Sequence, residues 1–338
     1  MNIFVVIQQM LVLLVMMLLG YIVFRIGWLD GNACSRMSKI VVNILNPCLM
    51  VYGVLGKDAH LDGSMLRQTL LLVIVYYGAL VLLSGPVASL LHVKKEHYNL
   101  YRLMLIFSNV GFMGIPVISS IYGKESMLLI AFYNLGYNLL LYTYGIYLAG
   151  KGSQAEREAE AGEEAFGKEG IEAGKKVPAA KDRTSENGMS WKKLLNPGVA
   201  SCVAAIVIFA SGAALPESVC TFFDYVGNAA VPLSMILIGA SVAQGGKKEF
   251  FTDMKMYVFM AIKMLAIPVA AALLLRLLPW HSMVEGVFIL MLAMPVGSIV
   301  VMLASESGND TIECTKGSIL TTLVSVLTIP IVSAFLQF

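Results

Sequence analysis

Charged residues are scarce in this sequence. Only 14% of the 338 residues are Asp, Glu, Lys or Arg, and 58% are hydrophobic. Soluble globular chains carry about a quarter charged residues, so this balance excludes an ordinary soluble domain and indicates an integral membrane protein. The net charge of +2 gives no indication of nucleic-acid binding.

The sequence also lacks the motifs of several function classes. It has no P-loop pattern GxxxxGK[ST], which excludes an ATP-driven pump acting by itself. It has no HExxH, no Ser/His/Asp arrangement and no Cys/His cluster, so no enzyme, cofactor or metal site is predicted. No apolar segment has adjacent aspartates at its centre, as a sodium/proton antiporter on a related scaffold is expected to need.

What the sequence does contain is a series of long apolar segments. A membrane-spanning helix needs about 20 apolar residues to cross a hydrocarbon core of about 30 Å. Ten segments meet this requirement, and we predict an all-α membrane protein with spans near 3–24, 36–56, 68–91, 100–121, 126–149, 194–214, 221–243, 254–277, 283–304 and 317–337.

A polar segment divides the spans into two groups of five. Residues 150–193 carry nine Lys/Arg and nine Asp/Glu with few apolar residues, which predicts a disordered linker. A short amphipathic helix on the membrane surface is the alternative. The expected organisation is therefore a first five-helix repeat at 1–149, this linker, and a second five-helix repeat at 194–338.

The distribution of Lys and Arg predicts the orientation. The linker and the other loops on its side hold 19 of the 24 Lys/Arg residues, and the opposite loops hold 4. Since cytoplasmic loops are rich in Lys and Arg, we expect the linker in the cytoplasm and both termini outside, in the cell (inner) membrane.

Matching prolines suggest that the two groups are inverted repeats. Pro47 and Pro232, Pro86 and Pro268, and Pro116 and Pro295 are 185, 182 and 179 residues apart. Units with an odd number of spans enter the membrane in opposite senses. Inverted repeats with interrupted helices at matching positions are typical of secondary transporters.

The fourth span contains residues that break helices. The stretch from Ser108 to Val117 holds Gly111, Gly114 and Pro116 in the middle of an apolar segment. A helix broken at this depth survives only where it is buried in protein or lines a cavity. We expect a non-helical link before Pro116 and a new half-helix beginning there, with a second break near Pro295. Free N–H groups at such helix starts favour an anion.

Several polar residues lie deep in the predicted spans. Lys263 is the ionisable residue well inside a span, where a charge is costly and indicates function. It is expected to balance an anionic substrate or to cap the carbonyls of a half-helix, unless it extends to the membrane surface. Asn109 and Ser298 flank the two breaks, and Asn46 precedes Pro47 as a ligand or a structural donor.

At this point the sequence resembles the auxin efflux carrier family of membrane transporters. The resemblance is carried by Ser108–Pro116, Asn46-Pro47, Val231–Ala240 and Ala293–Ser298. It implies ten helices in two inverted repeats, with crossed, broken helices four and nine. It also implies a scaffold part made of spans one, two, six and seven, a homodimer, and an organic anion as substrate.

The fifth span also matches the family. Asn138 and Tyr142 stand on one face with Asn134, and the resemblance implies that Asn138 and Tyr142 help to bind the carboxylate. Hydrogen bonding between helices is the alternative role. The short linker fits a bacterial member, and such members are associated with malate, malonate and similar carboxylates.

The predicted function is a secondary transporter of small organic anions that works by alternating access. The predicted binding residues are Asn46, Asn109, Pro116, Asn138, Tyr142, Lys263, Pro295 and Ser298. The partners expected are the anion, membrane lipid, and a proton or sodium ion for coupling. A sodium-coupled symporter of the bile-acid type is the first alternative, and a non-transporting membrane receptor is the second.

Overall fold

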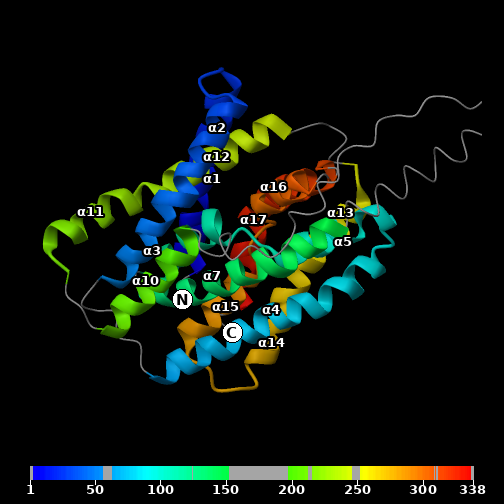
Figure 1. The fold of residues 1–338 in the computed structure, drawn as a ribbon. Coiled ribbons are helices and arrows are strands. Elements are labelled where there is room, and N and C mark those ends of the chain that lie inside the picture. The colour runs from blue at the N-terminus through cyan, green and yellow to red at the C-terminus, as the bar shows by residue number, and fades with distance from the viewer. Residues whose placement is uncertain are drawn as a thin grey trace, which may run out of the picture.

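A computed structural model describes residues 3–55, 63–123, 125–151, 197–211, 215–245, 252–307, 309 and 311–335. Throughout these residues the regular structure is helical (Figure 1). The predicted linker lies almost entirely outside the described residues. The helices, including segments with π-type hydrogen bonding (η), are α1 (Ile3–Arg25), α2 (Gly31–Ile40), η1 (Val41–Leu45), α3 (Asn46–Val54), α4 (Gly63–Leu90), α5 (Lys95–Ile106), η2 (Val110–Gly114), α6 (Ile115–Tyr122), α7 (Ser126–Leu140), η3 (Leu141–Gly145), α10 (Pro197–Ser211), α11 (Glu217–Asn228), α12 (Ala230–Gly245), α13 (Met254–Ala261), η5 (Ile262–Ala266), α14 (Ile267–Leu275), α15 (Ser282–Leu292), α16 (Ser298–Glu306) and α17 (Ile312–Phe335).

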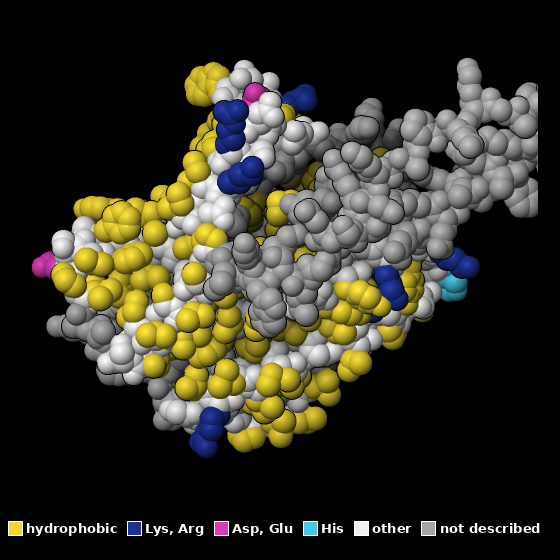
Figure 2. Space-filling view, viewed as in Figure 1, with side chains coloured by type: hydrophobic (Ala, Val, Ile, Leu, Met, Phe, Trp, Pro, Cys, Tyr) yellow, Lys and Arg dark blue, Asp and Glu magenta, His cyan; other side chains and the backbone are white. Residues whose placement is uncertain are grey.

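Among the residues that the structure describes, four helical stretches are long and apolar enough to cross a membrane. They are Gly63–Leu90, Glu217–Gln244, Met254–Leu275 and Ile312–Phe335. Side chains of these stretches are only partly buried inside the molecule, and hydrophobic side chains cover much of its visible surface, with Lys and Arg toward the edges (Figure 2). Such an apolar exterior is expected of a protein that faces lipid.

The first helix packs very closely against α12. A Cβ atom on Gly20 would lie 2.0 Å from the carbonyl oxygen of Ile236, and a Cβ atom on Gly239 would lie 1.8 Å from that of Met17. Only glycine fits at either position. Small residues allow membrane helices to approach at backbone distance, where van der Waals packing holds them together.

The helices α3, α10 and α11 form a neighbouring group, and they lie on the opposite side of the molecule from α5 and α13 (Figure 1). The contact of α3 with α11 again depends on glycine. A Cβ atom on Gly227 would lie 2.8 Å from the Cα of Leu49.

Three of the π-type segments stand directly before a proline. Helices α3, α6 and α14 follow η1, η2 and η5, and they carry Pro47, Pro116 and Pro268 near their first residues. Proline has no N–H and its ring crowds the preceding turn, so a widened turn before it lets the helix continue. Pro86 lies inside the continuous helix α4, so it differs locally from its predicted counterpart Pro268.

The fourth and ninth predicted spans are interrupted, but the expected position of the first break was wrong. Helix α5 ends at Ile106, and the link is Phe107–Asn109 rather than the glycine-containing stretch before Pro116. Gly111 and Gly114 lie within η2. The second half-helix begins at Val110 because Asn109 caps it: the Asn109 side-chain oxygen accepts a hydrogen bond from the Phe112 N–H at 3.2 Å.

The second break lies near Pro295, as expected, but the role of Pro295 differs from the expectation. It lies within the second link, between the end of α15 at Leu292 and the start of α16 at Ser298. It therefore starts no half-helix, and its carbonyl oxygen takes part in the crossing described below.

Candidate functional site

The two links cross and pair as a short antiparallel bridge. Ser108 stands opposite Val296. The Asn109 N–H donates to the Pro295 carbonyl at 2.7 Å, and the Gly297 N–H donates to the Phe107 carbonyl at 3.0 Å. Each break thus satisfies backbone groups of the other, as non-helical backbone at membrane depth must.

The crossing requires a close approach of the two chains. A Cβ atom on Gly297 would lie 3.0 Å from the Ser108 carbonyl oxygen and 3.2 Å from that of Phe107. Helix α17 supports the second link, because the Thr321 hydroxyl accepts a hydrogen bond from the Val296 N–H at 3.0 Å. The crossing is therefore tightly packed, and a side chain larger than glycine at position 297 would push the two links apart.

Protein donors cap the C-terminal ends of both half-helices that enter the crossing. The Lys263 ammonium donates to the Leu105 carbonyl at 3.0 Å and to the Ser108 hydroxyl at 2.8 Å, near the end of α5. The Tyr76 hydroxyl donates to the Met291 carbonyl at 3.1 Å, near the end of α15. These contacts satisfy carbonyls at helix ends that have no partner within the helix.

The Lys263 side chain is 2% exposed. Within the described part of the chain, it forms no ion pair with a carboxylate, and both of its hydrogen-bond acceptors are neutral oxygens. An ionisable side chain this deep in a predicted span is costly and indicates a functional role.

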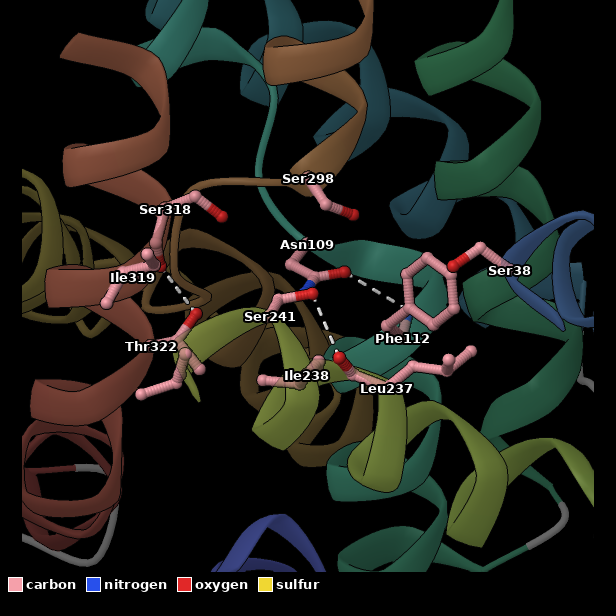
Figure 3. Close-up of a pocket in the computed structure, with 11 residues that line it drawn as sticks. Ser38, Asn109, Phe112, Leu237, Ile238, Ser241, Ser298, Ser318, Ile319 and Thr322 are labelled. Atoms are coloured by element: carbon pink, nitrogen blue, oxygen red, sulfur yellow. Dashed lines mark hydrogen bonds between the residues drawn. The ribbon is translucent and has the colours of Figure 1, made fainter. Parts of the chain in front are cut away.

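The N-terminal ends of the two other half-helices meet at a cavity of about 70 Å³ (Figure 3). Asn109 caps the first of these half-helices and Ser298 begins the second, and both line the cavity. None of the described lining residues is charged. The other residues that line it are Ser38, Phe112, Leu237, Ile238, Ser241, Val242, Ser318, Ile319 and Thr322.

Comparison with known proteins decides the class of this molecule. The profile of a family described as membrane transport protein matches residues 5–333. The chain belongs to this membrane transport protein family. The resemblance to the auxin efflux carrier family is thereby confirmed.

Two archaeal transporters are similar over nearly their whole length. An uncharacterized transporter of Methanothermobacter thermautotrophicus is 24% identical over an alignment of 338 positions that covers 97% of this chain and 98% of the relative. An uncharacterized transporter of Methanocaldococcus jannaschii is 22% identical over 323 residues, which are 94% of this chain and 95% of the relative. Family and relatives indicate a membrane transporter rather than an enzyme.

The structure of this family member brings some predicted site residues together. Asn109 and Ser298 line the cavity, and Lys263 contacts the residue before Asn109. Asn46 lies close by, because a Cβ atom on Gly111 would be 3.3 Å from its side-chain nitrogen.

Other predicted site residues do not line the cavity, although Pro295 belongs to the crossing. Pro116 and Pro295 are buried, and the Pro116 carbonyl accepts hydrogen bonds from Ser119 and Ser120 within α6. Asn138 and Tyr142 are not among the residues that line the cavity. The Asn138 side chain instead donates to the Asn134 carbonyl at 2.8 Å.

Sequence reasoning missed most of the cavity lining. Ser38, Ser241, Ser318 and Thr322 contribute hydroxyl groups from α2, α12 and α17. A signal existed, since each hydroxyl stands in or beside an apolar segment. The same residues also serve ordinary helix packing, as Ser241 and Thr322 show by donating to carbonyls within their own helices. The role of Tyr76 was also missed, because its acceptor, the Met291 carbonyl, is 215 residues away in the sequence.

An ionic cluster lies away from the cavity, where α13 meets α17. Lys316 contacts Asp253 at 2.7 Å and Glu313 at 2.6 Å. Burial by itself would raise the pKa of Asp253, but the hydrogen bond and the charge of Lys316 outweigh it and hold this pKa below its usual value. Tyr101 of α5 donates to Glu313 at 3.1 Å, so the cluster joins three helices.

Proposed function

We propose that this membrane transport protein is a secondary transporter of small organic anions and works by alternating access. The substrates would be carboxylates of the size of malate or malonate, or auxin-like acids. The anion would bind at the cavity beside the crossing, in contact with Asn109 and Ser298.

One observation carries the proposal: the crossing neutralises its negative helix ends and leaves its positive ends facing a cavity. Lys263 and Tyr76 cap the C-terminal ends, whereas the N-terminal ends at Asn109 and Ser298 border the cavity. Helix N-termini carry a partial positive charge and free N–H donors, which attract anions.

The position of the cavity supports alternating access. Its walls come from α2 and α12 on one side and from the crossing with α17 on the other. The resemblance assigns α2 and α12 to the scaffold part and the crossing to the transport part. Movement of the transport part against the scaffold part would expose the cavity to each side in turn, in two inverted five-helix repeats with ten spans.

Uptake into proteoliposomes tests this function. Labelled malate, malonate and indole-3-acetate are supplied with an inward proton gradient, a sodium gradient, or neither, and protein-free liposomes are the control. We expect saturable uptake of at least one of these anions, and dependence on one gradient would identify the coupling ion. Failure of all three anions under every condition would contradict the proposal and favour a receptor.

A further inference from the structure

We propose that the Lys263 ammonium is the resident cation of the crossing. It occupies the place that an alkali cation would take at the end of α5, so anion transport needs no coupled sodium ion. This inference rests on the proposed function for its transport consequence, but the cation site itself follows from the contacts of Lys263.

The oxygen atoms around Lys263 are the kind that bind an alkali cation. Leu105 is the second-last residue of α5, and its carbonyl is among the four that a helix leaves without an internal partner. The Ser108 hydroxyl belongs to the unwound link. Carbonyls at half-helix ends and in unwound backbone coordinate sodium in many secondary transporters. Here an ammonium group donates to these oxygens at 3.0 and 2.8 Å.

Lys263 is held in this position by its own helix. It belongs to η5, the widened turn that precedes Pro268, and its side chain is almost fully buried. The charge is therefore part of the fold and cannot leave with the substrate. A coupling ion would instead enter and leave in each cycle.

The second half-helix end shows what a simple cap looks like. Tyr76 contacts the Met291 carbonyl at the end of α15 through a neutral hydroxyl. This carbonyl also accepts the Met294 N–H at 3.3 Å, so neutral donors alone satisfy a helix-end carbonyl at this crossing. A charged donor at Lys263 is therefore not needed to satisfy a carbonyl. A positive charge near the N-terminal ends at the cavity would in addition attract an anion.

Removal of the lysine should create a sodium site. We compare the wild type with Lys263→Ala, which leaves space, and Lys263→Met, which fills the space without a donor. Melting temperatures of purified protein are measured in sodium chloride and in choline chloride at equal concentration. We expect sodium to raise the melting temperature of Lys263→Ala by several degrees, and to leave the wild type and Lys263→Met unchanged.

Uptake of labelled malonate gives the transport consequence. We expect wild-type uptake to be the same in sodium and in choline, and Lys263→Arg to retain it within a few-fold. Lys263→Ala should fall at least tenfold in choline and recover at least fivefold in sodium. Tyr77→Phe, which removes a buried hydroxyl that donates to the Tyr133 carbonyl, should show no sodium effect and is the matched control.

Two results would overturn the inference. The first is wild-type uptake driven by a sodium gradient. The second is a Lys263→Ala protein whose melting temperature and uptake are the same in both salts. If the wild type transports none of the carboxylates, the proposed function fails, and the melting temperatures still decide whether Lys263 occupies a cation site. If Lys263→Ala is not recovered folded in either salt, Lys263→Ser replaces it.

Discussion

The two broken helices of this transporter share one geometry and differ in chemistry. Their links pair backbone to backbone around Ser108 and Val296, and each half-helix that enters the crossing has a capped C-terminal end. The first of these ends meets a lysine and the second a tyrosine. Likewise, the residues that pair across the bridge include Asn109 in one link and Gly297 in the other.

Because of these differences, the two links have different roles. Gly297 allows the second link to pass within contact distance of the Ser108 carbonyl, so it sets the geometry of the crossing. Asn109 caps the new half-helix and lines the cavity, so it serves the site. Lys263 and Tyr76 then divide the crossing into a charged end and a neutral end.

The largest loss of uptake is expected from adding a side chain at Gly297, where the two links are in contact. Gly297→Val would force side-chain carbons against two backbone carbonyls, and overpacking of this kind costs about 1–3 kcal/mol. Uptake of the anion should be abolished and the melting temperature in detergent should fall. Gly78→Val is the control, because a Cβ atom at Gly78 meets nothing within 4 Å. Equal uptake by the two variants would show that the crossing tolerates separation of its links.

A smaller effect is expected from Asn109→Ala. The variant loses the cap of the second half-helix, which is worth about 1 kcal/mol, together with one polar group of the cavity. Uptake should fall about tenfold while the amount of protein in the membrane stays normal. Asn43→Ala serves as the control, since Asn43 is exposed and donates within its own helix. Wild-type uptake by Asn109→Ala would remove Asn109 from the site.

Tyr76→Phe should have a milder effect than Lys263→Ala or Lys263→Met. It removes one neutral hydrogen bond to the Met291 carbonyl, worth about 1 kcal/mol. We expect a slightly lower melting temperature and uptake reduced by less than threefold. If Tyr76→Phe impaired uptake as severely as Lys263→Met, the proposed distinction between a neutral and a charged end would be wrong.

The smallest effect concerns the ionic cluster of the second half. Because Lys316 holds the pKa of Asp253 below its unfolded value, the pair stabilises the fold above that unfolded value, about 3.9, and this contribution is lost as pH falls through the folded value. Asp253→Asn should therefore lower the melting temperature at pH 7. The difference from the wild type should shrink below about pH 4. A difference that is independent of pH would exclude the charge of Asp253 as its cause.

The sequence was informative where the physical constraint is local. Low charge content and long apolar segments predicted a helical membrane protein, and helix-breaking residues predicted interruptions in the fourth and ninth spans. The role of Lys263 as a donor to half-helix carbonyls was among the stated expectations, and it follows from general rules about helix ends and buried charges. The role of Asn109 as a helix cap was not predicted and is seen only in the structure.

The positions of the breaks depended on contacts that no local pattern contains. The first link begins at Phe107 because its carbonyl and the Asn109 N–H pair with residues 190 and 186 positions away in the chain. Pro116 lies in the interrupted span, as expected. The helix is not broken at Pro116, because the π-type turn η2 before it accommodates the proline ring. The cavity hydroxyls on α2, α12 and α17 meet only through tertiary packing, so their common location could not be predicted.

The most direct test of the central claim is to locate a bound anion. Crystals of the protein grown with bromosuccinate would reveal the bromine atom through its anomalous scattering. We predict a peak in the cavity beside the crossing, with the carboxylate in hydrogen-bond contact with Asn109 and Ser298. A bound anion seen only at another place in the molecule would contradict the claim that the open, positive helix ends form the binding site.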